Sequence, residues 1–381
     1  TKLMILGIME LIEAVEGRTR FLIPGQDEDS AFPPGTAAVF YNRRMELNRD
    51  ATVLLLQVIH PEDYIDTMGA TGVRGLRIAQ ECGIKVTIND RDSRAVELIS
   101  KNIAHSGIDT ITVTKSDVNV LLSGNRFDAV DLDPFGTPAP FIDSAIRSAR
   151  HFLMVTATDT APLCGAHKKA GMRRYFSQPL NNEYHSETGL RTLLGFVVRE
   201  ALKYDIGLVP QFCFAHEHFV RLHLQVRRGT SAAERSLSSI GYIMQCPKCP
   251  SRSDQHGMLP QPMVCEYCGT HLTPVGPLWL GGIQSDPLLD AMAEKIPLLP
   301  LGTSRELAVL ISLCRNELAT AGFYDYHQLA KRERRSPPPM DELLERIHSM
   351  GFPATRCHYL GTGVKTTAPL PLLLQAVKGD C

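Results

Sequence analysis

Long apolar runs are absent from the sequence. The longest, residues 53–56 and 369–374, fall far short of the ~20 residues that a helix needs to cross a bilayer. The apolar stretch at 3–8 is short as well, and because no small-residue cleavage site follows it, it does not predict a signal peptide. We therefore expect a cytoplasmic protein that does not associate with membranes.

A disulfide framework is absent too, although the chain has ten cysteines. Four of them form two Cys-x-x-Cys pairs and the other six are scattered, a usage that favours a reducing compartment and a metal site. The sequence has no internal repeat. With 381 residues, 44% of them hydrophobic, it is long enough for two domains with sizeable cores.

An overall excess of positive charge, expected of a protein that binds polyanions, is also missing. The formal net charge is −1, but residues 145–250 hold 14 Lys and Arg against 7 Asp and Glu. This local excess suits phosphate binding, and it equally suits a solvated surface without a nucleic-acid partner. The candidates for phosphate contacts are Lys168, Lys169, Arg173, Arg174, Arg227 and Arg228.

What the chain does have, from Ala51 to about Arg227, is an alternation of apolar runs and amphipathic stretches. This pattern predicts a parallel sheet flanked by helices, an α/β fold of the doubly wound, Rossmann-like kind. The predicted strands are 64–68, 85–89, 110–114, 127–132, 152–156, 211–215 and 219–226. The predicted helices begin near Val73, Ser93, Ala139 and Thr188.

Two further regions flank the predicted α/β domain, which we assign to residues 51–236. Residues 1–50 are predicted to form an N-terminal arm that folds over the carboxyl edge of the sheet. A polar break after Arg228 precedes a smaller α+β domain, residues 237–381, which carries two cysteine pairs and a mostly helical tail.

A glycine-rich turn follows the first predicted strand. Asp66 ends that strand, and Gly69, Gly72 and Gly75 follow at three-residue spacing as a helix begins. Glycine there lets the backbone turn sharply and approach a ligand at the amino end of the helix. By itself the motif is weak, because many such turns bind nothing.

Two acidic residues strengthen the case for a nucleotide site. Asp90 closes the second strand, where a carboxylate can accept both ribose hydroxyls, and Asp117 follows the third, where it can reach an adenine amino group. NAD and S-adenosylmethionine both contain adenosine, and these residues alone do not separate them. The spacing Gly-x-x-Gly-x-x-Gly, rather than Gly-x-Gly-x-x-Gly, favours a cofactor without a pyrophosphate.

The segment Asp133-Pro134-Phe135-Gly136 ends the fourth strand, at the sheet edge where α/β enzymes bind ligands. The Asp133 carboxylate and the Pro134 carbonyl can each accept a hydrogen bond from an amino group on a flat ring, turning its lone pair towards an electrophile. Phe135 can stack on such a base and Phe40, from the arm, can close its other face. The alternative is a strand that ends in a proline turn with a buried phenylalanine.

The cysteine pairs predict a metal site. Cys246 and Cys249 are followed, after fifteen residues, by Cys265 and Cys268, the spacing of a four-cysteine zinc site. Four thiolates close a tetrahedron and leave no open position for catalysis, so the role of the zinc is structural.

Taken together, these residues resemble the tRNA (guanine-26-N2)-dimethyltransferase family, whose members are class I S-adenosylmethionine-dependent methyltransferases. The resemblance covers nearly the whole chain. Besides the motifs above it includes segments 16–17, 39–42, 48–50, 156–159, 161–167, 276–281, 323–325 and 354–356.

The resemblance implies transfer of one or two methyl groups from S-adenosylmethionine to N2 of guanine 26 in tRNA. It implies that Asp133 is the catalytic carboxylate beside Pro134, and that Phe40 and Phe135 sandwich the guanine. The implied cofactor-binding residues are Arg49, Asp66, Gly69, Gly72, Asp90 and Asp117. It also implies that the C-terminal domain helps to hold tRNA.

Two other functions remain open at this stage. An amino-methyltransferase acting on ribosomal RNA or DNA could use a similar Asp-Pro-aromatic segment. A non-catalytic, zinc-containing RNA-binding module would need neither cofactor nor carboxylate, and intact acidic residues at three strand ends argue against it. We expect no obligate protein partner in any of these cases.

Overall fold

The computed structural model describes residues 11–25 and 39–379, which form two compact units. The first unit includes residues 11–25, 39–133, 147–152 and 291–309, and the second includes 134–146, 153–290 and 310–379. Residues 1–10 and 26–38 of the predicted arm lie outside the described residues. Among the helices in the described ranges, none has the length and apolar character needed to cross a membrane.

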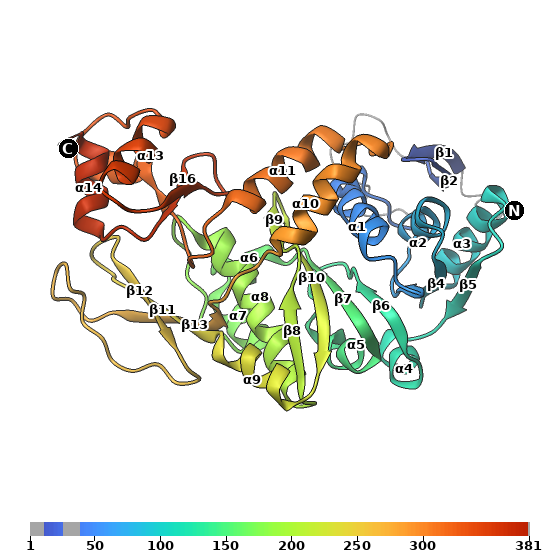
Figure 1. Ribbon diagram of the computed structural model, residues 1–381. Helices are drawn as coiled ribbons and strands as arrows, with labels where there is room; N and C mark the ends of the chain where they lie inside the picture. Colours follow the sequence, from blue (N-terminus) through green and yellow to red (C-terminus); the bar gives the residue numbers. More distant parts are fainter. Residues whose placement is uncertain (1–10, 26–38, 380–381) are drawn as a thin grey trace, which may run out of the picture. The chain divides into compact units, whose positions relative to one another are not determined.

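The first unit contains a hairpin, a parallel sheet and flanking helices (Figure 1). Its strands are β1 (Leu11–Glu16), β2 (Thr19–Pro24), β3 (Asp63–Asp66), β4 (Lys85–Asp90), β5 (Ile111–Lys115) and β6 (Phe127–Leu132). Its helices are α1 (Glu46–Ile59), α2 (Val73–Arg77), α3 (Ser93–Ser106) and α4 (Val118–Gly124), with shorter turns η1 (Arg43–Met45), η2 (Ile78–Cys82) and η4 (Ile296–Leu298). Four elements run through both units: α5 (Ile142–Ser148), β7 (Ala149–Ala157), α10 (Asp286–Lys295) and α11 (Ser304–Asn316).

An eight-stranded sheet has the order β5-β4-β3-β6-β7-β10-β8, with β9 pairing with β10. Within the first unit, β5, β4, β3 and β6 are parallel neighbours. The chain places β4 and β5 on one side of β3 and then crosses to place β6 on the other. The carboxyl ends of β3 and β6 therefore meet at a switch point, where Asp66 pairs in register with Asp131. Ligands of doubly wound sheets bind at such points.

Local sequence signals explain where α2 and α3 begin, and both predicted starts are confirmed. Gly72 has φ +82° and precedes α2, which begins at Val73. The Asp92 side chain accepts a hydrogen bond from the Arg94 backbone nitrogen at 2.9 Å and so caps α3. Gly107, with φ +68°, ends α3 in the left-handed conformation that glycine adopts at low cost.

Helix α1 differs from the expected arm. It begins at Glu46 and crosses the predicted boundary after Asp50, and its residues from Leu47 to Leu56 are all buried. Sequence patterns did not indicate it because a helix buried on every side has no polar face, and its buried polar residues resemble those of a loop. The division into residues 1–50, 51–236 and 237–381 remains a prediction.

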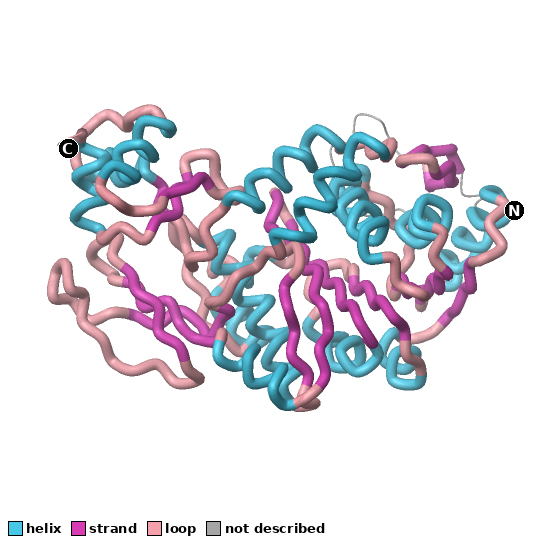
Figure 2. The backbone as a smooth tube through the Cα atoms, in the orientation of Figure 1, coloured by secondary structure: helices cyan, strands magenta, loops and turns pink. Residues whose placement is uncertain are grey.

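The second unit contains further strands and helices, coloured magenta and cyan in Figure 2. Its strands are β8 (Ile206–Pro210), β9 (Phe214–His216), β10 (Phe219–Arg228), β11 (Ile240–Gln245), β12 (Arg252–His256), β13 (Thr273–Trp279), β14 (Tyr324–Asp325), β15 (Ala354–Arg356) and β16 (Gly363–Thr366). Its helices are η3 (Ala139–Phe141), α6 (Thr160–Leu163), α7 (Lys168–Tyr175), α8 (His185–Leu202), α9 (Thr230–Ser238), α12 (Tyr326–Arg332), α13 (Met340–Ser349) and α14 (Leu370–Lys378).

The predicted strand 211–215 is wrong in position. The structure has β8 at Ile206–Pro210, paired antiparallel with β10, and only the short β9 beyond it. Sequence patterns did not predict β8 because Gly207 interrupts its run of strand-forming residues. The structure requires it, since a Cβ there would lie 2.3 Å from the Ala232 carbonyl oxygen on α9.

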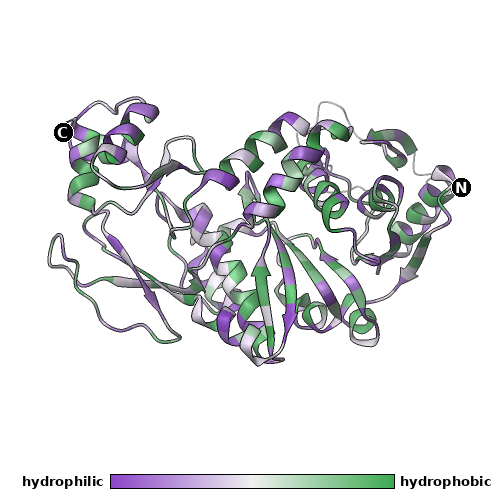
Figure 3. Cartoon of the chain, in the orientation of Figure 1, coloured by the Kyte–Doolittle hydropathy of each residue, from purple (hydrophilic) through white to green (hydrophobic). Residues whose placement is uncertain are grey.

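The C-terminal region contains two three-stranded sheets, β12-β11-β13 and β14-β16-β15. Together with α12, α13 and α14 they make the α+β region that the sequence predicted. In Figure 3 the strands of the large sheet are mostly hydrophobic, and many helices show both colours. This pattern fits a sheet covered on both faces by amphipathic helices.

Candidate active site and metal centre

The glycine-rich turn follows β3 and lies against β4. The Gly69 backbone nitrogen donates to the Asn89 carbonyl oxygen at 2.8 Å, and Gly72 donates to Gly69 at 2.7 Å. A Cβ on Gly69 or Gly75 would lie within 2.5 Å of Ile88. Glycine is therefore required both for the turn and for the close packing of the turn against β4. Because the turn follows β3, its backbone lies near the switch point.

The acidic residues predicted for the nucleotide lie at the ends of β4 and β5. Asp90 Oδ2 accepts from the Ala70 backbone nitrogen at 2.9 Å, so it holds the glycine-rich turn. Asp117 Oδ1 caps α4 by accepting from Asn119 at 2.9 Å, and Asp117 is exposed. Both carboxylates thus have structural contacts, and the parallel register of β4 and β5 brings them to the same sheet edge.

One buried arginine, Arg74 on α2, lies close to the carboxylates at the ends of β3 and β6. Its Nη2 donates to Asp133 Oδ2 and, over 2.9 Å, to Asn48 Oδ1, while its Nη1 lies 3.6 Å from Asp131 Oδ2. Asp131 also accepts from the Tyr64 hydroxyl at 2.7 Å. The Asp133 side chain is 22% exposed and that of Arg74 is 4% exposed. A buried cation therefore fixes one oxygen of a carboxylate that reaches the surface.

Asp66, deeper in the same cluster, has a perturbed acidity. Burial raises its pKa to about 7, Arg74 opposes this rise, and the neighbouring carboxylates of Asp131 and Asp133 reinforce it. For the same reason the pKa of Arg74 lies above its ordinary value, because the carboxylates outweigh the cost of burial. Strongly shifted groups beside a strand end are typical of functional sites.

The role of Arg74 was missed from the sequence. The residue lies inside the glycine-rich segment, but its partner Asp133 is fifty-nine positions away. Only the parallel register of β3 and β6 shows that the two are neighbours. The one available signal was a charged residue among the glycines, on the first turn of α2.

The turn that follows Asp133 belongs to the second unit. Pro134 is buried and Phe135 is 88% exposed. Gly136, with φ +95°, donates to Thr158 Oγ1 at 2.8 Å and accepts from the Thr158 nitrogen at 3.0 Å. Phe135 is thus on the surface of its unit, whereas the alternative interpretation, a proline turn with a buried phenylalanine, required a buried ring. Phe40, in the first unit, is 40% exposed, and its pairing with Phe135 around a base stays a prediction.

A second set of polar contacts lies behind this turn. Asp159 Oδ1 accepts from the Tyr175 hydroxyl at 2.6 Å, and Asp159 Oδ2 pairs with Arg174 at 3.0 Å. The Tyr175 hydroxyl also lies 2.8 Å from Thr137 Oγ1. Burial raises the pKa of Asp159, while Tyr175 and Arg174 oppose the rise. These contacts connect α7 to the turn that carries Phe135.

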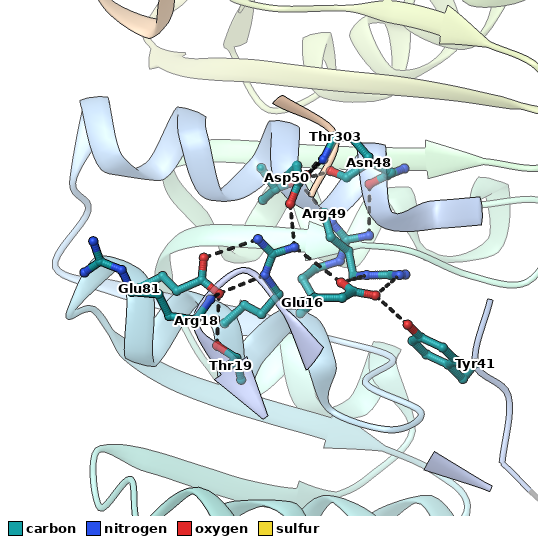
Figure 4. A network of polar contacts seen from close by, with 12 residues as sticks. Glu16, Arg18, Thr19, Tyr41, Asn48, Arg49, Asp50, Glu81 and Thr303 are labelled. Carbon is teal, nitrogen blue, oxygen red and sulfur yellow. Dashed lines mark hydrogen bonds and ion pairs between the residues drawn. The ribbon is translucent and has the colours of Figure 1, made fainter. Parts of the chain in front are cut away.

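Arg49 was expected to bind the cofactor, and the structure places it in a buried network (Figure 4). Its Nε donates to Glu16 Oε2 at 2.8 Å, and its Nη2 donates to the Asn42 carbonyl oxygen at 3.1 Å. Glu16 also accepts from the Tyr41 hydroxyl at 2.7 Å. Burial alone would raise the pKa of Glu16, but Arg49 and Arg77 hold it below its usual value.

The same network continues to α1 and to the segment after η4. Arg77 Nη1 lies 2.7 Å from Asp50 Oδ1, and Arg77 Nε lies 3.0 Å from Glu81 Oε1. Asp50 Oδ2 accepts from the nitrogen and hydroxyl of Thr303 at 2.8 and 2.7 Å. The β1–β2 hairpin, α1, α2 and residue 303 are therefore joined through Arg77, whose Nη1 also lies 3.3 Å from Glu16 Oε2. Arg49 shares Glu16 with Arg77 and so has a structural role, and its binding of the cofactor stays a prediction.

The four predicted metal ligands come together. Sγ atoms of Cys246, Cys249, Cys265 and Cys268 all lie within 4.8 Å of one another, in a region where three of the four cysteines are buried. Backbone hydrogen bonds from Cys246 to Ser251 and from Cys265 to Thr270 shape the two turns. Four thiols in this arrangement can close a tetrahedron around one metal ion, which fits a structural zinc.

Comparison with known proteins agrees with this geometry. A sequence model described as N2,N2-dimethylguanosine tRNA methyltransferase matches residues 17–378. Two curated relatives named tRNA (guanine(26)-N(2))-dimethyltransferase come from Methanoculleus marisnigri and Methanoregula boonei. They are 59% and 58% identical, and each alignment covers 97% of this chain and 100% or 99% of the relative.

A solved structure is also similar over nearly the whole chain. It is Trm1 from Pyrococcus horikoshii in complex with S-adenosyl-L-methionine, with a TM-score of 0.87 and 32% sequence identity. The match covers 97% of this chain and 100% of the Pyrococcus chain.

Proposed function

The chain belongs to the N2,N2-dimethylguanosine tRNA methyltransferase family and is a tRNA guanine-N2 dimethyltransferase, and we propose here how its residues perform that reaction. The methyl donor is S-adenosylmethionine, and the target is the exocyclic N2 of guanine 26. The observation that carries the proposal is the pairing of partly exposed Asp133 with buried Arg74 at the β3–β6 switch point.

The cofactor site comprises the glycine-rich turn and the acidic residues that end β3, β4 and β5. Asp90 and Asp117 are positioned to accept hydrogen bonds from ribose hydroxyls and from an adenine amino group, as in other adenosine sites. The close packing of Gly69 and Gly72 against Ile88 and Ile99 fixes the turn that follows β3. When bound, S-adenosylmethionine supplies a methyl group on a positively charged sulfur.

Asp133 acts directly on the guanine. Its Oδ2 is held by Arg74, while its Oδ1 has no hydrogen bond within residues 11–25 and 39–379. Oδ1 accepts a hydrogen bond from the N2 amino group, and the Pro134 carbonyl accepts the second, which turns the nitrogen lone pair towards the methyl carbon. The new N–C bond forms as the S–C bond breaks, and the proton released from N2 passes to Asp133 Oδ1.

Phe135 contributes binding energy rather than chemistry. A base must leave its stack before its amino group can be reached, and a planar side chain compensates for the lost stacking. The phenyl ring of Phe135 is 88% exposed and follows Asp133 by two residues. Stacking of this kind contributes about 1–3 kcal/mol per base. Phe40 is proposed to cover the opposite face of the guanine.

The direct test supplies radiolabelled S-adenosylmethionine and an unmodified tRNA transcript, digests the RNA and identifies nucleosides by mass. We expect N2-methylguanosine and N2,N2-dimethylguanosine, and no product from a transcript with adenosine at position 26. Label appearing in ribosomal RNA or duplex DNA but not in tRNA would contradict the proposed substrate. Failure to bind the cofactor in calorimetry would instead favour a non-catalytic RNA-binding module.

We also propose that Cys246, Cys249, Cys265 and Cys268 hold one structural zinc ion, and that residues 237–381 help to bind tRNA. Support comes from the sulfur geometry and from the packing of Cys246, Cys249 and Cys265 against buried residues of α12, α13 and α14. Elemental analysis should find about one zinc per chain. A Cys246→Ser/Cys249→Ser variant that retained both zinc and thermal stability would contradict this assignment.

A further inference from the structure

Helix α7 has an exposed basic face. Lys168, Lys169 and Arg173 are exposed, and none of them has an ion pair or side-chain hydrogen bond in the described part of the chain. Met172 and Phe176 on the same segment are 45% and 66% exposed. Unpaired cations interleaved with exposed apolar side chains are typical of surfaces that bind phosphate and stack on nucleotides.

The buried side of α7 is fixed tightly to its unit. Gly171 packs so closely that a Cβ there would lie 2.5 Å from the Pro162 carbonyl oxygen. At the carboxyl end, Arg199 donates to the carbonyl oxygens of Tyr175 and Phe176 at 2.8 and 3.2 Å. The position of the exposed face is therefore determined by the fold and not by side-chain freedom.

Phe176 is held in an unusual backbone conformation. Its φ is +46°, in the left-handed region that glycine adopts far more readily than phenylalanine. Its backbone nitrogen caps α7 by donating to Met172 at 3.0 Å, and its ring lies near Phe196 with centroids 6.5 Å apart. The chain thus keeps an exposed aromatic ring at a position where glycine would be less strained.

Helix α7 also contacts the turn that carries Phe135. The Tyr175 hydroxyl reaches Thr137, and both Arg174 and Tyr175 bind Asp159. Thr158, next to Asp159, holds Gly136 through two hydrogen bonds. One continuous set of contacts therefore links the basic helix to the segment proposed to hold the guanine.

The other basic candidates in this unit lie far from that turn. Arg221, near the start of β10, donates to Thr156 near the end of β7 at 2.9 Å. Strand β10 then runs away from this point, and at ~3.3 Å per residue Arg227 lies roughly 20 Å farther along. Arg227 is in register with Gly207, at the beginning of β8. Among the six candidates, those on α7 are the ones next to the guanine-binding turn.

We propose that the exposed face of α7, formed by Lys168, Lys169, Met172, Arg173 and Phe176, binds the tRNA backbone beside the nucleotide that is methylated. The proposal rests on the function proposed above and adds where the RNA is held. The three cations contact phosphates, and Phe176 stacks on an unpaired neighbouring base or sugar. Because α7 is fixed to the turn at Thr137, this contact sets the position of the RNA relative to Phe135.

The test measures tRNA binding by fluorescence titration at several salt concentrations. A Lys168→Gln/Lys169→Gln/Arg173→Gln variant should bind tRNA about tenfold more weakly or worse at moderate salt. The slope of log Kd against log salt should fall by roughly one for each lost phosphate contact. The matched control, Lys203→Gln/Arg227→Gln/Arg235→Gln, removes the same charge from exposed positions of the same unit and should retain the original slope.

Equal weakening in both variants would mean that net charge, not α7, determines binding and would overturn the proposal. An unchanged slope in the α7 variant would overturn it as well. In steady state the α7 variant should have a higher KM for tRNA and an unchanged affinity for S-adenosylmethionine in calorimetry. If the unaltered chain methylates no tRNA at all, the proposed function fails first, and this inference fails with it.

A Phe176→Gly variant separates binding from folding. Glycine suits the left-handed conformation, so the thermal unfolding midpoint should not fall, whereas tRNA binding should weaken by about three- to tenfold as a stacking contact is lost. A loss of affinity accompanied by a lower midpoint would show that Phe176 acts on structure alone, and an unchanged affinity would remove Phe176 from the proposed surface.

Discussion

Two buried clusters of charge, one in each compact unit, shift the pKa values of their carboxylates in opposite directions. In the first unit, Arg74 faces Asp66, Asp131 and Asp133 at the ends of two parallel strands. Burial and the neighbouring carboxylates outweigh the arginine, so the pKa of Asp66 rises to about 7. The cluster also has an outlet to the surface, because the Asp133 side chain is 22% exposed.

The second cluster joins α8 to the C-terminal region of the second unit. Lys365 Nζ lies 2.7 Å from Glu187 Oε1 and 2.8 Å from Glu317 Oε1, and all three side chains are at most 3% exposed. Arg191 pairs with Glu187 at 2.8 Å, and His358 lies 2.6 Å from Glu317. Burial raises the pKa of both glutamates, but the cations outweigh it and hold both below their usual values.

Equal burial therefore has opposite consequences, and the difference indicates function. A cluster whose carboxylates all have close cations stays ionised and acts as a structural pair, costly to break but chemically inert. A cluster that keeps one carboxylic group poised near neutral pH and another open to solvent is suited to handling protons. The following experiments test that distinction, from the largest expected effect to the smallest.

Removing the charge of Asp133 should have the largest effect. In an Asp133→Asn variant, methyl transfer should fall by about a hundred- to ten-thousandfold, because the amide cannot take the proton released from N2. Single-turnover methylation measures the rate, and calorimetry with S-adenosylmethionine is the control for intact cofactor binding. Rates within a few-fold of those of the unaltered enzyme would show that Asp133 is not the catalytic carboxylate.

Breaking the second cluster should affect stability instead of chemistry. A Lys365→Met variant leaves Glu187 and Glu317 without their shared cation, and its free energy of unfolding should fall by about 3–5 kcal/mol. Lys101→Met, which breaks an exposed pair with Glu97, should change the free energy of unfolding far less, because water screens the pair. Urea titration measures both values. If the Lys365→Met variant folded but had lost methyl transfer, the second cluster would not be purely structural and the two clusters would not differ in function.

Replacing Arg74 should affect activity through Asp133. An Arg74→Gln variant should lose about ten- to a hundredfold in kcat, since the carboxylate is no longer held in place. Arg74→Lys, which keeps a cation beside Asp133, should recover part of the lost kcat, while the KM for tRNA and the calorimetric Kd for S-adenosylmethionine should change little in both variants. A fall in kcat that follows a fall in the thermal unfolding midpoint, with no recovery in Arg74→Lys, would indicate a purely structural role.

Short-range signals explain what the sequence could predict. Gly72 and Asp92 determine the beginnings of α2 and α3 within a few residues, and both helices were found. The cysteine pairs are equally local, and their four sulfurs converge as their spacing indicated. Asp133 and Phe135 were predicted as site residues from an equally local pattern, since the residues that define the segment are consecutive.

Long-range contacts explain what the sequence could not. Arg74 acquires its role from the register of β3 and β6, which no local pattern encodes. Strand β8 was misplaced because Gly207 is required by close packing against α9, a helix more than twenty residues away in the sequence. Helix α1 was missed because Asn48, Arg49 and Asp50 are buried by partners from other segments, and polarity alone suggested a loop.

The smallest effect, and the most direct comparison, is the pH dependence of stability. The folded pKa of Asp66 is about 7, above its ordinary value of 3.8, so the folded chain binds the extra proton and loses stability as pH rises towards 7. Asp66→Asn removes this loss, and its stability relative to the unaltered chain should rise by about 1–2 kcal/mol between pH 6 and pH 8. The stability contribution of Glu187 depends on pH in the opposite direction, because its pKa is lowered and its stabilisation is lost only as pH falls through that value. Glu187→Gln should therefore be destabilised to a similar degree at pH 6 and pH 8. Urea titrations at the two pH values measure both variants, and the same pH trend in both would mean that the two clusters are electrostatically alike.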